Sequence, residues 1–209
     1  MGGNATTFPL GTVPVSPDIN DGTLARTRSP LAGPIGLDAG SPTPARGGSS
    51  AAPIGTQVVQ YAQARAARRA GDGECFALAD GALRNAGAKS AADFGSVTED
   101  ADYVWGAAVS LADVQPGDII QFRDYEVTRR EEKQDGSWQE RTEKRPHHTA
   151  IVISNQGHGM LRVIEQNSPQ GSAVREIQLG FETTTFQSGS TSVRITVSGR
   201  LWFYRPQAR

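Results

Sequence analysis

The sequence contains a single cysteine among its 209 residues, so no disulfide can form within the chain. It contains no apolar run long enough to span a bilayer. The first twenty residues carry neither the basic start nor the apolar stretch of a standard secretory signal. These absences predict a protein without a transmembrane segment, either cytoplasmic or exported by a non-standard route.

The chain also lacks a strong charge of either sign. Its 21 Lys and Arg residues are offset by 22 Asp and Glu residues, which gives a formal net charge of −1. Without a basic field, the composition does not indicate binding to nucleic acid or to an anionic membrane surface. The length predicts one domain with a tail, and it leaves the oligomeric state open.

Residues 1–53 are rich in Gly, Pro, Ser, Thr and Ala, and they show neither helical nor strand periodicity. Such a segment buries too little apolar surface to offset the entropy lost on ordering. We therefore predict a disordered leader over residues 1–53 and a folded domain over residues 54–209.

Two helical patterns open the predicted domain. The first follows Thr56, a favourable N-cap residue, and is expected to end at Gly71. The second is predicted over residues 75–86, with Gly87 after its end. Cys75 falls in the first turn of this second helix, where unpaired backbone N–H groups and the helix dipole stabilise a thiolate.

The rest of the domain has the patterns of antiparallel strands. A final hairpin is expected around Ser198-Gly199, between SVRITV and RLWFYRP. Helices followed by a run of strands predict an α+β fold. The other predicted strands cover residues 116–122, 147–153, 161–167 and 173–179.

A segment of mixed charge, residues 123–146, separates the first two of these strands. Asp135-Gly136 near its middle is typical of a hairpin turn, so we expect a protruding two-stranded ribbon or a mobile loop. Because the charges balance, we interpret its side chains as solvated. A contribution to substrate contact is the alternative.

A cysteine hydrolase requires a thiolate, a base that takes its proton and a third group that orients the base. Cys75 is the only thiol, although a lone cysteine is often an inert buried side chain. His147 and His148 open a predicted strand, whereas His158 lies in a predicted turn. Since side chains alternate across a strand, only one of the adjacent histidines can face the thiol.

Glu165 and Asn167 are the candidates for the orienting group. They lie two residues apart in one predicted strand and so share a face. We favour Glu165, with Asn167 as a supporting polar residue, because a full negative charge stabilises an imidazolium more than an amide does. The alternative is that Glu165 is solvated and that Asn167 forms a turn.

Other chemistries have weaker support. Adjacent histidines on a strand cannot easily ligate one ion, and the sequence has no CxxC or HExxH spacing that would indicate zinc. It also lacks the GxSxG elbow typical of serine hydrolases. We therefore expect no metal and no other cofactor.

Four blocks, GDGECFALADGAL, PGDIIQF, HHTAIV and VIEQN, occur in this order. They resemble the CHAP and NlpC-type branch of the papain-like superfamily, the cysteine- and histidine-dependent amidohydrolases and peptidases, over about residues 54–206. The resemblance implies a papain-like fold in which N-terminal helices, with the nucleophile at a helix start, pack on an antiparallel sheet. It implies Cys75 as nucleophile, His148 as base, and Glu165 and Asn167 as the polar pair.

The same resemblance implies a reaction and a substrate class. Members of this branch mostly cleave amide bonds in peptidoglycan peptides by thiolate attack through a thioester. The alternative is a papain-like module that binds a peptide or glycan without turnover. The set of Cys75, His148 and Glu165 or Asn167 favours the enzyme, because a binding module does not need these groups together.

Removal of the leader tests the predicted domain boundary. A chain that begins at Ala52 should keep the cooperative thermal melt of the full chain, because residues 1–51 lack the apolar content to contribute to a core. Calorimetry of both chains measures this. A large drop in Tm would show that the leader belongs to the folded domain.

Overall fold

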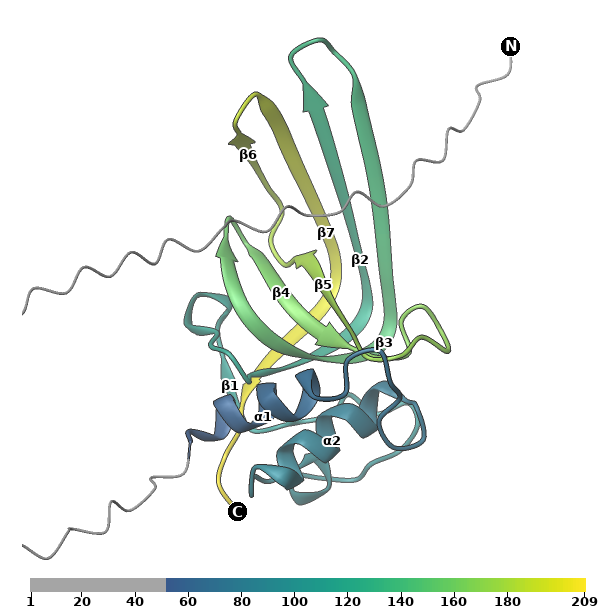
Figure 1. Cartoon of the computed structure of the whole chain (residues 1–209), viewed down its shortest axis with the longest axis vertical. Helices are drawn as coiled ribbons and strands as arrows, with labels where there is room; N and C mark the ends of the chain where they lie inside the picture. The colour runs from purple at the N-terminus through teal and green to yellow at the C-terminus, as the bar shows by residue number, and fades with distance from the viewer. Residues whose placement is uncertain (1–51) are drawn as a thin grey trace, which may run out of the picture. The chain divides into compact units, whose positions relative to one another are not determined.

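The structure is a computed structural model that describes residues 52–209. The leader predicted for residues 1–53 lies almost entirely outside the described residues. The described part contains two α-helices and one large antiparallel sheet, which is the α+β class predicted from the sequence (Figure 1). No helix within it is long and apolar enough to cross a membrane.

The first helix, α1 (Ile54–Gln63), is shifted and shorter than predicted. It begins directly after Pro53, so the prediction of Thr56 as N-cap was wrong. It also ends well before Gly71. Ala67 adopts a left-handed φ of 61° and donates its N–H to the Val174 carbonyl, so this part of the chain pairs with another segment in place of continuing the helix.

The second helix, α2 (Cys75–Asn85), confirms the predicted helix and its start at Cys75. Ala79 and Leu83 are buried, as their spacing predicted. Gly87 has a φ of 66°, a conformation that favours glycine directly after a helix.

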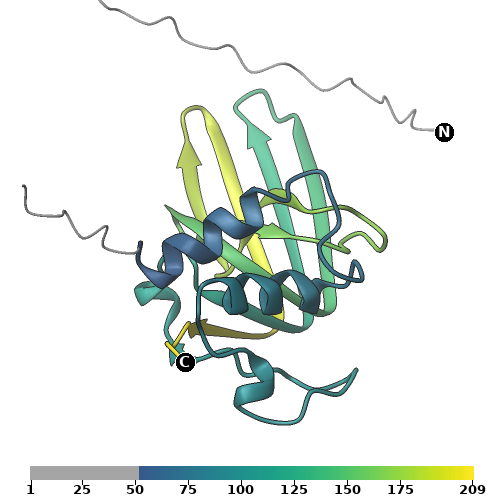
Figure 2. The ribbon, with the colours of Figure 1, turned by 60° about the horizontal axis from the view of Figure 1, so that its bottom comes forward.

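Within residues 52–209, seven antiparallel strands form a single sheet. Their order is β1-β7-β2-β3-β4-β5, and β6 pairs with β7. Figure 2 shows α1 and α2 lying across one face of this sheet. The strands are β1 (Ala107–Val109), β2 (Ile119–Lys133), β3 (Trp138–Gly157), β4 (Met160–Glu165), β5 (Arg175–Gly180), β6 (Thr184–Ser188) and β7 (Thr191–Arg205).

The charged segment 123–146 forms a two-stranded ribbon, the first of the two predicted possibilities, and not a mobile loop. It is the continuation of β2 and β3, which pair up to a turn at Asp135-Gly136. However, β2 also pairs with β7 up to Lys133, so the ribbon belongs to a wider sheet and is not an isolated hairpin.

The hairpin predicted around Ser198-Gly199 is wrong, because β7 is one continuous strand. Gly199 has a φ of 93° and packs against the Asp124 backbone, where the register between β2 and β7 shifts. A glycine with positive φ suits a β-bulge as well as a hairpin turn. Ser198-Gly199 therefore marks a bulge, and its interpretation as a turn was wrong.

The bulge reverses which side chains of β2 share a face. Phe122 and Tyr125 are three residues apart, yet their ring centroids lie 5.0 Å from each other. Because β3 keeps a constant register with β2, His148 lies opposite Phe122 and Arg145 lies opposite Tyr125. Opposite residues in antiparallel strands share a face, so Arg145 and His148 are both on this one.

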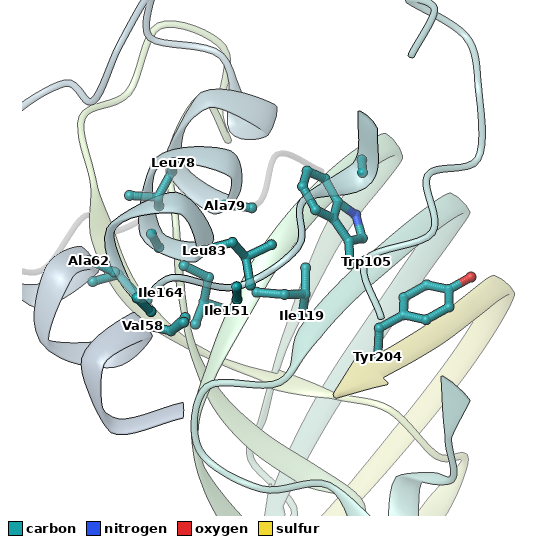
Figure 3. Close-up of a cluster of buried hydrophobic side chains, with 14 of the residues drawn as sticks. Val58, Ala62, Leu78, Ala79, Leu83, Trp105, Ile119, Ile151, Ile164 and Tyr204 are labelled. Atoms are coloured by element: carbon teal, nitrogen blue, oxygen red, sulfur yellow. The ribbon is translucent and has the colours of Figure 1, made fainter. Parts of the chain in front are cut away.

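Two apolar clusters cover the two faces of the sheet. Ile151 belongs to the cluster beneath the helices, and its neighbours Ala150 and Val152 belong to the other, which confirms the alternation predicted for this strand. Figure 3 shows the cluster beneath the helices. It includes Val58, Ala62, Leu83, Trp105, Ile119, Ile151 and Ile164.

A close contact between two glycines attaches α1 to the turn before β2. Gly117 has a φ of 91°, and a Cβ on it would overlap the Gly55 backbone. The neighbouring Asp118 is buried and accepts hydrogen bonds from the Gln115 N–H and the Arg205 guanidinium. Gly117-Asp118 therefore has a structural role.

Replacing Gly117 by alanine should lower the free energy of unfolding by about 2–5 kcal/mol, since a positive φ and an overpacked contact both add to the cost. Gly136→Ala is the matched control, because Gly136 has a φ of 79° with open space around it. Its loss should stay near about 1–2 kcal/mol. Urea denaturation measures both, and equal losses would show that the Gly55 contact contributes nothing.

Candidate active site

Cys75 stands at the N-terminal end of α2 as a free, partly exposed thiol. Its backbone N–H is one of those at a helix start that have no partner within the helix. The first turn of α2 contains no acidic residue. The helix dipole and the unpaired N–H groups therefore act on the thiol without a competing negative charge within that turn.

His148 contacts a buried carboxylate. It lies on β3 with 4% of its surface exposed, and its Nε2 is 3.1 Å from Oε2 of Glu165. Burial is the largest influence on the His148 pKa and lowers it, but hydrogen bonds and charges of Cys75 and Glu165 outweigh burial and raise the pKa above its ordinary value. Protonation of this imidazole is therefore favoured beside the thiol.

Glu165, the last residue of β4, is fully buried. Arg145 donates to it from Nε at 2.9 Å and from Nη2 at 2.8 Å, and Arg175 donates from Nη2 at 3.0 Å. Burial raises the Glu165 pKa, but His148 and Arg145 outweigh it and bring the pKa to about 2. The group is therefore a carboxylate across the physiological range.

Arg145 is the residue that the sequence interpretation missed. It lies in the charged segment 123–146, whose side chains we expected to be solvated, yet only 2% of its side chain is exposed. For Arg145 that expectation was wrong. The bulge at Asp124 turns Arg145 and His148 to one face, and no charge or hydropathy pattern in the segment marks the bulge.

Asn167 lies apart from these groups, because β4 ends at Glu165 and the two residues do not share a strand. It has a φ of 62°, as expected for a turn former. Its Nδ2 donates to the Glu74 carboxylate at 2.6 Å, and its Oδ1 accepts the Gly171 N–H at 2.6 Å. The prediction that Asn167 faces the same way as Glu165 was therefore wrong.

The other histidines have different surroundings. His147 Nε2 lies 2.8 Å from the Ala101 carbonyl, and its ring centroid is 5.4 Å from that of Tyr103. His158 stacks on Phe186 with centroids 4.4 Å apart. Of the three histidines, His148 is the one that contacts Glu165.

An aromatic cluster borders the thiol. The centroid of Phe76, next to Cys75 in α2, lies 5.1 Å from that of Tyr103 and 5.1 Å from that of Trp105. Burial and then the charge of Cys75 raise the Tyr103 pKa. Arg123 binds Asp100 and Asp102 and so fixes the segment that carries Tyr103.

Within residues 52–209, no group of three or more His, Cys, Asp or Glu side chains is placed to hold a metal ion. The candidate site instead offers the Cys75 thiol, the His148 imidazole and the ionised Glu165 carboxylate. Such a set suits nucleophilic catalysis, in which the carboxylate orients and stabilises the imidazolium.

Comparison with known proteins gave one match. A family model described as "AIM3/BBC1 Cysteine proteinase-fold domain" matches residues 48–209. No curated protein and no solved structure matches the chain. The match supports the papain-like cysteine proteinase fold expected from the sequence, and it does not place the chain in the CHAP and NlpC-type branch.

Replacing Arg145 by methionine should lower the free energy of unfolding by about 3–5 kcal/mol at neutral pH, because a buried carboxylate loses its main cationic partner. Arg141→Met is the control. Arg141 and Arg145 both bind Glu143, but 70% of the Arg141 side chain is exposed. Its loss should stay within about 0.5 kcal/mol. Urea denaturation measures both, and similar losses would contradict the role given to Arg145.

The same variant should respond differently to acid. The folded pKa of Glu165, about 2, lies below its ordinary value of 4.5, so its ionisation stabilises the fold above pH 4.5. That contribution is lost as the pH falls toward 2. In Arg145→Met the folded pKa of Glu165 rises, so less stability should be lost between pH 4.5 and 2 than in the wild-type protein. Urea denaturation at several pH values measures this difference.

Proposed function

Because the chain belongs to the family of AIM3/BBC1 cysteine proteinase-fold domains, we propose that it is a cysteine hydrolase that cleaves an amide bond through a thioester. The observation that carries the proposal is the position of His148. Its ring contacts the Glu165 carboxylate, and both Glu165 and Cys75 raise its pKa. Cys75, His148 and Glu165, the proposed nucleophile, base and orienting group, come from α2, β3 and β4.

The proposed reaction begins with a proton moving from the Cys75 thiol to His148. The thiolate sulfur bonds to the amide carbon, and the C=O π pair moves to oxygen. The Cys75 backbone N–H stabilises this oxyanion. When the pair returns, the C–N bond breaks and the amine leaves with the proton from His148. His148 then takes a proton from water, and the hydroxide bonds to the thioester carbon. The C–S bond breaks, the carboxylic acid leaves, and the proton on His148 returns to the Cys75 sulfur.

Glu165 supports this cycle without gaining a proton. With its carboxylate held by Arg145, it accepts the N–H at Nε2 of His148 and leaves Nδ1 as the ring nitrogen for the thiol. A permanent negative charge at this place stabilises the imidazolium that forms beside the thiolate. Asn167 supports the site indirectly through Glu74, the residue before the nucleophile.

The substrate class is the finer part of the proposal. The four sequence blocks favour a peptide of peptidoglycan type, and the family match agrees with a peptide amide of any origin. Cys75 is partly exposed beside an aromatic cluster, which suits an extended peptide that passes over the thiol.

One observation favours the alternative, a module that binds a peptide or glycan without turnover. A concavity of about 440 Å³ lies between the ribbon and β5. Its lining includes neither Cys75 nor His148. The residues that line the concavity include Val127, Arg129, Glu140, Arg141, Met160 and Leu179. We favour the enzyme, because the concavity has no comparable set of reactive groups.

Digestion distinguishes the hydrolase from the non-catalytic binding module. The wild-type protein is incubated with purified peptidoglycan and, separately, with a peptide library, and the products are analysed by mass. Cys75→Ala is the blank. New amide-cleavage products from the wild-type protein alone support the hydrolase, and the products identify the scissile bond. Retention of a ligand without any product supports the binding module.

We predict that His148, and not His147, is the base. His148→Ala should abolish hydrolysis and slow the alkylation of Cys75 by iodoacetamide, because the thiol loses the imidazole that takes its proton. His147→Ala, the matched control on the adjacent residue, should keep most of both activities. Reversed effects would mean that the base has been assigned to the wrong histidine.

A further inference from the structure

Gln166 is a fully buried amide beside the proposed site, and the mechanism above does not use it. It follows Glu165 directly and contacts the segment before the nucleophile. Its Oε1 accepts the Ala70 N–H at 2.8 Å. Its Nε2 donates to the Ala70 carbonyl at 2.9 Å and to the Glu74 carbonyl.

The bond to the Glu74 carbonyl has a geometric consequence. Glu74 and Cys75 share one peptide unit, which is planar, and in a trans peptide the N–H points opposite to the C=O. A donor that fixes the Glu74 carbonyl therefore also fixes the direction of the Cys75 N–H. This N–H is the group that stabilises the oxyanion in the proposed reaction.

We propose that Gln166 is a positioning residue that orients the Cys75 N–H and so pre-organises the oxyanion site. This inference rests on the proposed hydrolase function. The dipeptide Glu165-Gln166 then contacts both the proposed base and the peptide unit of the proposed nucleophile. Glu165 orients the base, and Gln166 orients the peptide unit of the nucleophile, from adjacent positions at the end of β4.

Two reagents separate these roles, because they differ in the charge they develop. Iodoacetamide alkylates the thiolate: a C–S bond forms, iodide leaves, and no oxyanion arises. p-Nitrophenyl acetate acylates the thiolate: the sulfur bonds to the carbonyl carbon, an oxyanion forms, and its collapse expels p-nitrophenolate and leaves an acetyl thioester. Only the second reaction depends on an oriented N–H at the oxyanion.

Gln166→Met keeps the size of the side chain and removes its hydrogen bonds. We expect acylation to slow by roughly 10- to 100-fold, since a displaced oxyanion donor loses much of its effect. Alkylation should stay within about threefold at each pH, because the interaction between thiol and imidazole remains. If Gln166→Met does not fold, Gln166→Glu replaces it, since it keeps the acceptor and loses the donors to Ala70 and Glu74. The same split is expected.

Gln121→Met is the matched control. Gln121 is also fully buried, and it bonds to Trp105, Thr149 and the Phe122 carbonyl. It should change the two rates in parallel, if at all, because it does not contact Glu74. A parallel loss of both rates in Gln166→Met, or no loss, would overturn the positioning role.

The wild-type protein tests the underlying function separately. If it is neither acylated nor alkylated faster than a free thiol, the hydrolase proposal fails and the role of Gln166 fails with it. If the wild-type protein is alkylated rapidly but never acylated, the thiol is activated, but both the thioester step and the inference on Gln166 are overturned. If the wild-type protein undergoes both reactions and Gln166→Met slows both equally or neither, only the inference on Gln166 is overturned. A split in Gln166→Met with parallel rates in Gln121→Met supports the inference.

Discussion

The contact between Arg145 and Glu165 is the interaction on which the candidate site depends. A carboxylate with no exposed surface is costly unless cations and donors surround it, and here a two-bond guanidinium contact provides them. The ionised Glu165 in turn holds the ring of His148, and both Glu165 and Cys75 raise the pKa of that imidazole. The ion pair thus keeps a buried negative charge next to His148, the proposed base.

Local patterns in the sequence were sufficient for the parts of the site that depend on a single element. The start of α2 at Cys75 follows from its helical spacing and flanking glycines. The opposite facing of His147 and His148 follows from strand alternation, and their contacts agree with it. Glu165 was a candidate partner because it lies in the predicted strand 161–167 and carries a full negative charge, and its contact with His148 agrees with that choice.

Features that arise between elements were not predictable in the same way. The burial of Arg145 requires the bulge at Asp124 and Gly199, which reverses side-chain facing across two strands. A charged side chain in a charged segment gives no local sign of this. Asn167 was misplaced for a related reason, since a strand pattern does not indicate the residue at which pairing stops. Gln166 bonds to a segment about ninety positions earlier in the chain.

The pairing of β3 suggests a further role for its charged residues. β3 pairs with β2 from Trp138 to Ile151, but within the described residues it pairs with β4 only from Ile151 onward. The preceding half is therefore an edge strand, whose unpaired backbone groups would accept a strand from another molecule. Lys144 is exposed on this edge, and Pro146 has no N–H to offer. The composition of the ribbon thus opposes self-association, a demand independent of any reaction at Cys75.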